Sequence, residues 1–508
     1  MRKYGFTFIL VCAYALFSHL YFLLRYSKNW MEWDTSMMTK YAQAVQSQAT
    51  IIPTGLVYPN GPGYSTMLSM LSDLSGLSVV TLQLFVLPIV GVLAVVFAYI
   101  TFLELTNTRR IALLATFLLS LQPDFLFTSS RGTHEKFTYL LILMSMFFLS
   151  RSFSRRENIK EFVYYVLLFY ISVLGMISFN FFFASTYILA VTLAFIIGYF
   201  ISEMPQIGVS FKRMVYTSAT TIVFFFSYMF YLYKPSRTLL YMFDTLADQI
   251  GVIALATEQH VTPQYTYIFN MWASFEVWLF LTLFNWVIAP LSLAAWIFLV
   301  YKFFKKKQRL ASSMLLLLMF YTAFSIQLLL TIFADRFGVF NNLELRVFPV
   351  LMFFAVPLAS ISIIKIVEFK GFGEVQRKAL KTAFALLFLV FVVNSLLKAT
   401  NDPMVSNKWL FYSPQEKEGI VWVEHNSQEE KIWAGLDERL RTVFFTYSNI
   451  GNYDRTKFTS LGNARFWLIS DIVEKRAQRI KRPLPDVVDK PIIYDSGHVK
   501  IYDTGGTK

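Results

Sequence analysis

The chain has 508 residues, of which 56% are hydrophobic and 18% aromatic, and only 15% carry a charged side chain. This composition excludes a soluble globular protein of this length and indicates a polytopic membrane protein. The net charge of +14 does not indicate a nucleic-acid partner, because the basic residues fall between apolar segments, where they report membrane topology. The single cysteine, Cys12, excludes intramolecular disulfides and cysteine-based zinc sites.

Eleven apolar segments are long enough to cross a bilayer. The first has no small-residue cleavage site after it, so we expect an uncleaved anchor. The spans are predicted near residues 4–25, 79–104, 110–127, 136–153, 161–178, 181–201, 213–233, 274–301, 310–333, 345–367 and 379–397.

Basic clusters occupy every second connection between these spans, at Arg2 and Lys3, Arg109 and Arg110, Arg151 to Lys160, Lys212 and Arg213, Lys302 to Arg309, and Lys365 to Lys381. We expect the chain to lie in the plasma membrane. The positive-inside rule then places these connections and the N-terminus on the cytoplasmic side. The connections at residues 26–78, 123–135, 234–273 and 334–344 then share the outer face. The odd number of spans sends the C-terminal segment outside.

The outer connections are long and contain helical patterns. Residues Thr35 to Gln48 form one pattern, and the sequence YPNGPGYS, from Tyr58 to Ser65, breaks it before a second short helix. Segment 238–250 has a similar composition. We expect all three to lie in the membrane interface rather than cross the membrane.

The predicted fold class is an all-α polytopic membrane protein with a small C-terminal α/β domain outside the membrane. The membrane domain covers residues 1–399 and the soluble domain covers residues 400–508. Ser413 to Glu416 form a capping box with proline at the first helical position, which predicts a helix towards Asn426. The sequence PIIYDSGHVKIYD alternates apolar and polar residues around Asp495 to Gly497, as expected for a β-hairpin.

Ionisable side chains collect next to the spans on the outer face. A carboxylate at a membrane boundary is costly to bury unless it faces water or serves a site, and a solvated helix end explains any one of them alone. Two acidic sites and several cations on one face make a shared site the better interpretation. The predicted substrate-binding residues are Glu32, Arg131, His134, Lys234, Arg237, Arg336, Arg346, Tyr58 and Tyr64.

This set of residues suits sugar transfer from a phosphate. A carboxylate can accept the proton of an acceptor hydroxyl that attacks the anomeric carbon, and guanidinium groups can bind the departing phosphate. Asp34 is the first choice for the catalytic base and Glu135 for a second catalytic acid. Glu32, Asp34 and Glu135 could instead ligate a divalent cation such as Mg²⁺ or Mn²⁺ through oxygen. No P-loop or dinucleotide fingerprint occurs, and HEKFT at His134 lacks the second histidine of a zincin helix.

These motifs resemble the GT-C superfamily of integral-membrane glycosyltransferases, which includes protein O-mannosyltransferases, oligosaccharyltransferases and lipid A aminoarabinose transferases. The resemblance is carried by EWD at Glu32 to Asp34, SRGTHE at Ser130 to Glu135 and LELRVFPVL at Leu343 to Leu351. It implies a catalytic acidic residue at Asp34, a second acidic residue at Glu135 and a ligand for lipid-linked phosphate at Arg346. Several of these families have Asp-Glu or Asp-x-Asp where this chain has Glu-Trp-Asp.

The preferred hypothesis is a glycosyltransferase that moves a sugar from a polyprenyl-phosphate-linked donor to a lipid, glycan or protein acceptor at the outer membrane face. A polymerase or ligase of lipid-linked glycans would also use outer arginines. A transporter or flippase would have charged or broken helices at the middle of the membrane, whereas the ionisable residues here lie near the span ends.

Overall fold

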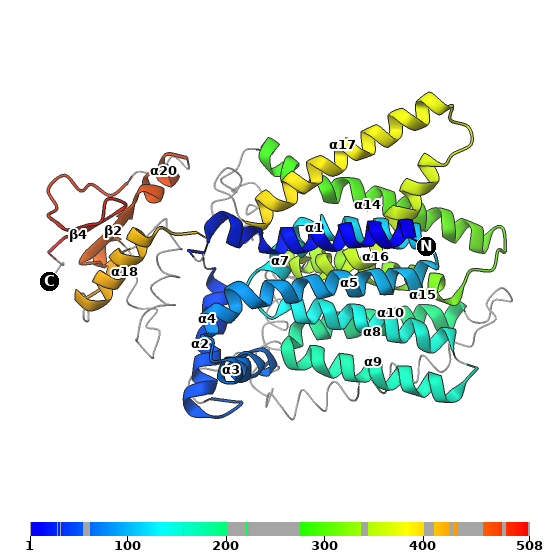
Figure 1. Cartoon of the computed structure of the whole chain (residues 1–508), viewed down its shortest axis with the longest axis horizontal. Coiled ribbons are helices and arrows are strands. Elements are labelled where there is room, and N and C mark those ends of the chain that lie inside the picture. The colour runs from blue at the N-terminus through cyan, green and yellow to red at the C-terminus, as the bar shows by residue number, and fades with distance from the viewer. Residues whose placement is uncertain are drawn as a thin grey trace, which may run out of the picture.

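The computed structural model shows a bundle of long helices, two short helices across one end of the bundle, and a small sheet beyond them (Figure 1). It describes residues 2–53 apart from 28 and 31, residues 61–201 apart from 156, the single positions 220 and 223, and residues 275–336, 344–400, 411–426, 430–433, 461–479 and 484–505. Every structural statement below concerns these residues.

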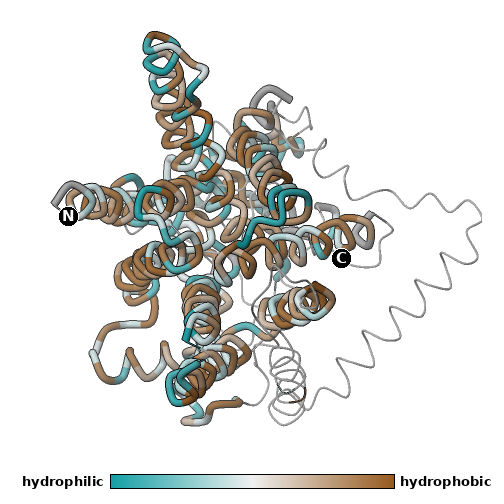
Figure 2. Tube along the Cα trace, turned by 90° about the vertical axis from the view of Figure 1, so that its right-hand side faces the viewer, coloured by the Kyte–Doolittle hydropathy of each residue, from teal (hydrophilic) through white to brown (hydrophobic). Residues whose placement is uncertain are grey.

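The long helices run along the bundle and are apolar over most of their length, as the view along the bundle in Figure 2 shows. Nine described helical stretches are long and apolar enough to cross a membrane, or ten with one bent pair. The predicted span at 213–233 lies outside the described residues. The helices are α1 (Arg2–Tyr26), α4 (Val79–Thr81) continuing through a π-helical turn (Leu82–Val86) into α5 (Leu87–Thr106), α6 (Arg109–Ser120), α7 (Pro123–Ser130), α8 (Glu135–Ser154), α9 (Ile159–Phe179), α10 (Phe181–Ile201), α14 (Phe275–Phe304), α15 (Ser312–Arg336), α16 (Glu344–Val367) and α17 (Glu374–Ala399).

The third predicted span, 110–127, is not one continuous helix. It consists of α6 and α7, whose axes differ by 67°. Gln122 has an extended backbone, with φ −71° and ψ 118°, and its side-chain oxygen accepts a hydrogen bond from the amide of Phe125. The residue before a proline avoids the helical region, so Pro123 ends α6 and starts α7. This bend carries the chain towards the end of the bundle where α7 stops.

Two helices lie across the end of the bundle, as the sequence predicts. Helix α2 (Trp33–Gln48) ends at Ala49, whose backbone is left-handed, and α3 (Gly63–Ser75) follows the predicted break. An ideal Cβ atom on Gly63 would lie 2.8 Å from the carbonyl oxygen of Ser178 in α9, so glycine allows α3 to approach α9 closely. Figure 1 shows both helices beside α4.

The last part of the chain contains a four-stranded mixed sheet with strand order β1-β2-β4-β3. Strand β1 (Ile432–Trp433) is parallel to β2 (Phe466–Ser470), whereas β2 and β3 (Ile492–Asp495) are both antiparallel to β4 (Val499–Asp503). Helix α20 (Asp471–Arg479) follows β2. The predicted β3–β4 hairpin is confirmed, with Gly497 at φ +83° in its turn.

The predicted capping box is also confirmed. The amide of Ser413 donates to Glu416 Oε2 at 2.7 Å, and the amide of Glu416 donates to Ser413 Oγ at 3.1 Å. These two bonds start α18 (Pro414–Asn426), which packs Ile420 and Val423 against the sheet. The fold class inferred from the sequence is thus confirmed, with a helical membrane part and a small C-terminal α/β part.

The C-terminal part contacts the segment between α1 and α2. Trp30 and Phe411 form an isolated antiparallel β-bridge, and the amide of Tyr412 donates to the carbonyl of Asn29 at 2.9 Å. The ring of Phe411 stacks on Tyr26 with ring centroids 4.9 Å apart. Helix α17 ends at Ala399 and residues 401–410 lie outside the described residues, so the domain boundary between 399 and 400 stays a prediction.

Candidate functional site

The site lies where α2 begins. Glu32 is the N-cap of this helix, and its carboxylate accepts hydrogen bonds from the amides of Asp34 at 3.0 Å and Thr35 at 2.8 Å. The hydroxyl of Thr35 donates to the same carboxylate at 2.7 Å. These bonds satisfy amides that have no partner inside the helix, and the positive end of the helix dipole favours a negative charge there. Glu32 is therefore fixed and buried, while the side chain of Asp34 is 53% exposed.

The guanidinium of Arg131 joins three carboxylates from two distant segments. Nη1 lies 3.4 Å from Glu32 Oε2 and 3.2 Å from Asp34 Oδ2, while Nη2 lies 3.1 Å from Glu135 Oε1. Glu135 is the first residue of α8 and is buried, and the guanidinium packs over the ring of Phe127. Only the planar fork of arginine offers donors in this many directions, so Arg131 organises the cluster.

The backbone around Arg131 is held by side chains from three other elements. The Gln83 amide donates to the Gly132 carbonyl at 2.9 Å, the Tyr64 hydroxyl donates to the same oxygen, and Lys136 Nζ donates to the carbonyl of Arg131. An ideal Cβ atom on Gly132 would lie 2.5 Å from Thr35 Cγ2, so a larger residue would push this loop away from α2. The position of Arg131 is thus set by packing as well as by charge.

Gln83 belongs to the π-helical turn between α4 and α5. Its amide nitrogen also donates to the carbonyl of Thr35 at 3.2 Å, and its oxygen accepts from Thr39 Oγ1 at 2.6 Å. One side chain thus holds both α2 and the Arg131 loop. π-helical turns are rare in proteins, and those that occur are often found at functional sites.

His134 is buried and hydrogen-bonded to the side-chain amide of Asn180, which lies between α9 and α10. Its Nδ1 lies 3.8 Å from Glu135 Oε2. Burial, the dominant effect, lowers the pKa of His134 despite the opposing charge of Glu135. His134 therefore supports the start of α8 through its hydrogen bond with Asn180, and direct contact with a substrate stays a prediction.

Arg346 is an accessible cation at the site. It lies two residues after the start of α16, its side chain is 45% exposed, and Nη1 is 4.0 Å from Glu135 Oε1. The guanidinium lies over the rings of Phe182 and Phe183 at the start of α10, with its carbon 6.0 and 5.6 Å from the ring centroids. These rings orient the group by cation–π contact and leave donors for an anionic ligand.

The charges of the cluster do not balance within it, because three carboxylates share Arg131. Burial is the main reason that the pKa of Glu32 rises to about 7. The negative charges of Asp34 and Glu135 also raise this pKa, whereas the positive charge of Arg131 lowers it. Burial alone would lower the pKa of Arg131, but the three carboxylates outweigh it and raise that pKa. Arg131 is therefore permanently charged, and Glu32 titrates near neutral pH.

The three carboxylates named as metal ligands surround a guanidinium group. Within the described part of the chain, no group of three or more His, Cys, Asp or Glu side chains is arranged to hold a metal ion. A divalent cation and Arg131 would compete for the same oxygens, so the donor set does not fit a metal in this arrangement. Metal binding by Glu32, Asp34 and Glu135 stays a prediction that requires Arg131 to move.

The site residues named from the sequence fall into three groups. Glu32, Asp34, Arg131, Glu135 and Arg346 meet in one cluster. Tyr64 and His134 lie beside it but are fully buried, and burial raises the pKa of the Tyr64 phenol. Tyr58, Lys234, Arg237, segment 238–250 and the side chain of Arg336 lie outside the described residues, so their assignments stay predictions.

Sequence reasoning missed the residues that support the cluster, namely Gln83, Lys136 and Asn180. A signal existed for each of them. Gln83 is a lone amide in an apolar run, Lys136 directly follows Glu135, and Asn180 separates two predicted spans. Polar side chains inside or between spans are costly in a membrane and tend to have a partner.

No protein-family model and no curated protein sequence matches the chain. Solved structures do match. ArnT from Cupriavidus metallidurans in the apo state has a TM-score of 0.54 at 10% identity, covering 99% of this chain and 98% of that one. ArnT bound to undecaprenyl phosphate gives a TM-score of 0.52 at 9% identity, covering 98% of both chains.

The oligosaccharyltransferase of Archaeoglobus fulgidus, tethered with an acceptor peptide, gives a TM-score of 0.53 at 10% identity. This match covers 90% of the present chain but 60% of the oligosaccharyltransferase, so the chain spans about six tenths of that protein's length. The matches extend over nearly the whole of the present chain and define its class of fold. Within this class the chain shares the fold of ArnT and of the archaeal oligosaccharyltransferase, as the resemblance inferred from its sequence implies.

Proposed function

We propose that this protein is a membrane glycosyltransferase that transfers a sugar from a polyprenyl-phosphate-linked donor to an acceptor. The observation that carries the proposal is the convergence of Asp34, Arg131, Glu135 and Arg346 at one end of a GT-C fold. The solved structures with this fold include one bound to undecaprenyl phosphate and an archaeal oligosaccharyltransferase in complex with a dolichol-phosphate. The acceptor class, whether lipid, glycan or protein, stays open.

Asp34 acts as the catalytic base in this proposal. It is the most exposed carboxylate of the cluster, with 53% of its side chain accessible, compared with 8% for Glu32 and 3% for Glu135. Its carboxylate accepts the proton of the acceptor hydroxyl while that oxygen attacks the anomeric carbon of the sugar. The bond from that carbon to the phosphate oxygen breaks at the same time, and the sugar inverts its configuration.

Arg346 stabilises the departing polyprenyl phosphate. Negative charge grows on the phosphate as the glycosidic bond breaks, and a fixed cation contributes most at the place where charge develops. The exposed guanidinium, oriented by Phe182 and Phe183, offers donors for this purpose. Arg131 differs because its donors are directed at three carboxylates, so we assign it to positioning Asp34 and Glu135.

The basic ends of the helices support an orientation with the site outside. Arg109, Arg110, Arg151, Lys302 and Lys305 lie at the helix ends opposite the cluster, so the positive-inside rule assigns the cluster and the C-terminal part to the outer face.

The test is Asp34→Asn in purified protein with a labelled polyprenyl-phosphate sugar and a mixture of candidate acceptors. We expect transfer to fall at least a hundredfold while donor binding changes little, because the amide keeps the size of the side chain but does not accept the proton. The matched control is Asp73→Asn, an exposed carboxylate on α3 that accepts a hydrogen bond from Gln46. Transfer at the wild-type rate by Asp34→Asn would remove the base assignment.

A further inference from the structure

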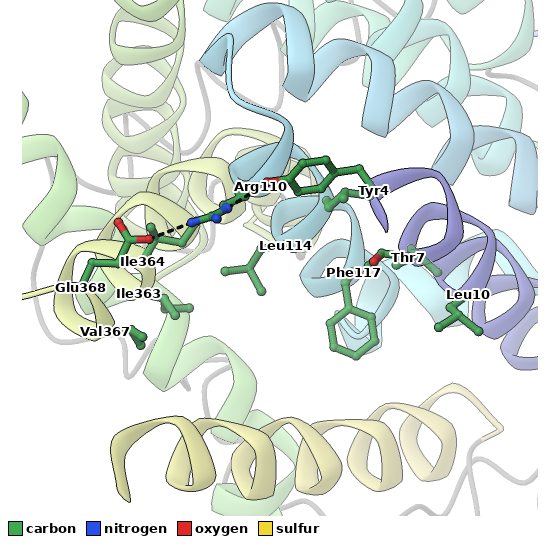
Figure 3. A pocket seen from close by; sticks show the side chains of 12 residues that line it. Tyr4, Thr7, Leu10, Arg110, Leu114, Phe117, Ile363, Ile364, Val367 and Glu368 are labelled. Atoms are coloured by element: carbon green, nitrogen blue, oxygen red, sulfur yellow. Dashed lines mark hydrogen bonds and ion pairs between the residues drawn. The ribbon is translucent and has the colours of Figure 1, made fainter. Parts of the chain in front are cut away.

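A cavity of about 520 Å³ lies between α1, α6 and α16, far from the carboxylate cluster (Figure 3). Its lining includes Tyr4 and Leu10 of α1, Leu114 and Phe117 of α6, and Ile363 of α16. Cavities of about 300–1,000 Å³ with apolar walls and a few polar groups are typical of small-molecule sites. The question is which molecule this cavity fits.

The cavity and the cluster lie at opposite ends of the bundle. Tyr4 lines the cavity, whereas Tyr26 stands next to Trp30 and the start of α2. These tyrosines are 22 residues apart on α1, which corresponds to about 33 Å along a helix at 1.5 Å per residue. That length is the thickness of the hydrocarbon core, so one phosphate group cannot occupy both places.

Helix α17 leaves the cavity accessible from the side. Its buried side chains, Phe391, Asn394, Ser395 and Ala399, all belong to its second half, and its first half points away from the bundle in Figure 1. Leu10 at the cavity is correspondingly half exposed. The rings of Phe117 and Phe388 meet edge to face, with centroids 5.9 Å apart, and link α6 to α17. The cavity is therefore wedge-shaped and opens sideways, on the side of the bundle where the first half of α17 points away; we call it the wedge.

One end of the wedge is polar and carries excess positive charge. Arg110 Nε donates to the Tyr4 hydroxyl at 3.0 Å, and Nη1 donates to Glu368 Oε1 at 3.0 Å (Figure 3). Arg109 precedes Arg110 in the chain, Lys370 follows Glu368 by two residues, and both are exposed. Two basic residues and Arg110 thus outnumber Glu368, and the guanidinium has five N–H donors, more than these two bonds require.

We propose that the wedge binds one anionic phospholipid of the adjacent bilayer leaflet. One acyl chain lies along Leu10, Leu114 and Ile363, and the phosphate accepts hydrogen bonds from Arg110. The combination of an apolar slot with a cationic end fits an amphiphile with an anionic head, and basic groups at a membrane surface attract anionic lipids. The lipid fills the space that the first half of α17 leaves open, and it ties α1, α6 and α16 together.

The alternative occupant is the tail of a polyprenyl phosphate. Under the proposed function the phosphate of this lipid lies at Arg346. Arg346 is about the thickness of the membrane away from Arg110, so the same phosphate cannot bind Arg110. The wedge site does not depend on that function, because only the cavity and the charges around it support lipid binding there.

The test measures how many lipid molecules remain bound to the full chain after purification in mild detergent. The bound lipid is extracted and quantified by mass spectrometry, and its amount is expressed per mole of protein. Leu114→Trp fills the wedge, and Ile171→Trp places the same side chain on the exposed face of α9 as the matched control. Arg110→Gln removes the head contact at a surface position and does not threaten folding. Thermal midpoints with added phosphatidylglycerol or phosphatidylcholine of equal chain length test the preference for an anionic head.

We expect about one phosphatidylglycerol-type lipid per wild-type chain, at least a fivefold loss in Leu114→Trp, and no loss in Ile171→Trp. Phosphatidylglycerol should raise the thermal midpoint more than phosphatidylcholine, and Arg110→Gln should abolish that difference. Equal lipid retention in Leu114→Trp and wild type would overturn the proposal, as would equal effects of both headgroups on the wild type. Displacement of the retained lipid by polyprenyl phosphate in equimolar amount would assign the wedge to the polyprenyl tail instead.

Discussion

Arg131 Nη1 lies 3.2 Å from Asp34 Oδ2, although 97 residues separate them in the chain. The same guanidinium reaches Glu32 and Glu135, so the start of α2 and the start of α8 are held together through one side chain. The most exposed carboxylate of the group is thereby kept at a fixed place while its neighbours remain buried. The first two predictions follow from this arrangement.

Replacing Arg131 by Gln should destabilise the protein strongly and abolish transfer. Removing one partner of a buried ion pair costs about 3–5 kcal/mol, because charges remain buried without compensation. Arg131→Lys should recover part of the stability but little activity, since an ammonium group cannot reach three carboxylates in fixed directions. Thermal unfolding in detergent and transfer rates measure both effects.

The control for Arg131 is Arg155→Gln, which breaks an exposed ion pair with Glu161. Exposed pairs contribute about 0–1 kcal/mol, so this variant should unfold at nearly the wild-type temperature. A thermal midpoint for Arg131→Gln equal to that of Arg155→Gln would mean that the cluster is not held by Arg131.

Stability should depend on pH through Glu32. Burial raises its pKa in the folded protein to about 7, above the unfolded value of about 4.5, so the folded state binds more protons between these values. The free energy of unfolding therefore decreases as pH rises from about 4.5 to 7. The thermal midpoint of wild type should fall over this window, and that of Glu32→Gln should fall less, because this variant has no proton to lose. Parallel pH profiles of the two proteins would contradict the assignment.

Gly132→Ala should loosen the site. The added methyl group would approach Thr35 Cγ2 to 2.5 Å and Gln83 Cβ to 2.9 Å, which forces the Arg131 loop away from α2. Overpacking of this kind costs about 1–3 kcal/mol. Gly5→Ala is the matched control, because a methyl group on Gly5 meets nothing within 4 Å. We expect a lower thermal midpoint and slower transfer only for Gly132→Ala, and equal behaviour of the two variants would show that the loop tolerates displacement.

Arg346→Gln should lower the efficiency with which the protein uses the polyprenyl-phosphate sugar donor. Loss of this exposed cation removes the proposed phosphate contact, so the KM for the polyprenyl-phosphate sugar should rise about tenfold or more, together with a lower kcat. Stability should change little, because the side chain is 45% exposed. Arg309→Gln, an exposed cation at the opposite end of the bundle, serves as the control. Unchanged donor kinetics in Arg346→Gln would exclude this residue as a phosphate ligand.

The sequence predicts the helical framework well, because apolar runs of about 20 residues leave few alternatives in a membrane. It also predicts α2, α3, α18 and the hairpin, each of which has a local signal such as the capping box at Ser413. The bend at Gln122 was missed even though Pro123 signals it, since the surrounding apolar run looked long enough for one span.

The arrangement inside the site could not be predicted from sequence patterns. Glu32 and Asp34 are two residues apart and chemically similar, yet one is buried and the other exposed. This difference arises because Glu32 caps α2, a position where Ser, Thr, Asp or Asn is usual. The choice of Arg131 as the partner of both also depends on where α7 ends, which is a property of the packed bundle.

The β-bridge between Trp30 and Phe411 bears on how the protein is made. Trp30 leaves the ribosome early, whereas Phe411 follows 411 − 30 = 381 residues later. At about 5–20 residues per second this interval is roughly 20–80 s. Throughout that time the segment leading into Glu32 lacks its pairing strand, so the nascent chain cannot complete the end of the bundle that holds the carboxylate cluster until translation of the membrane helices is over.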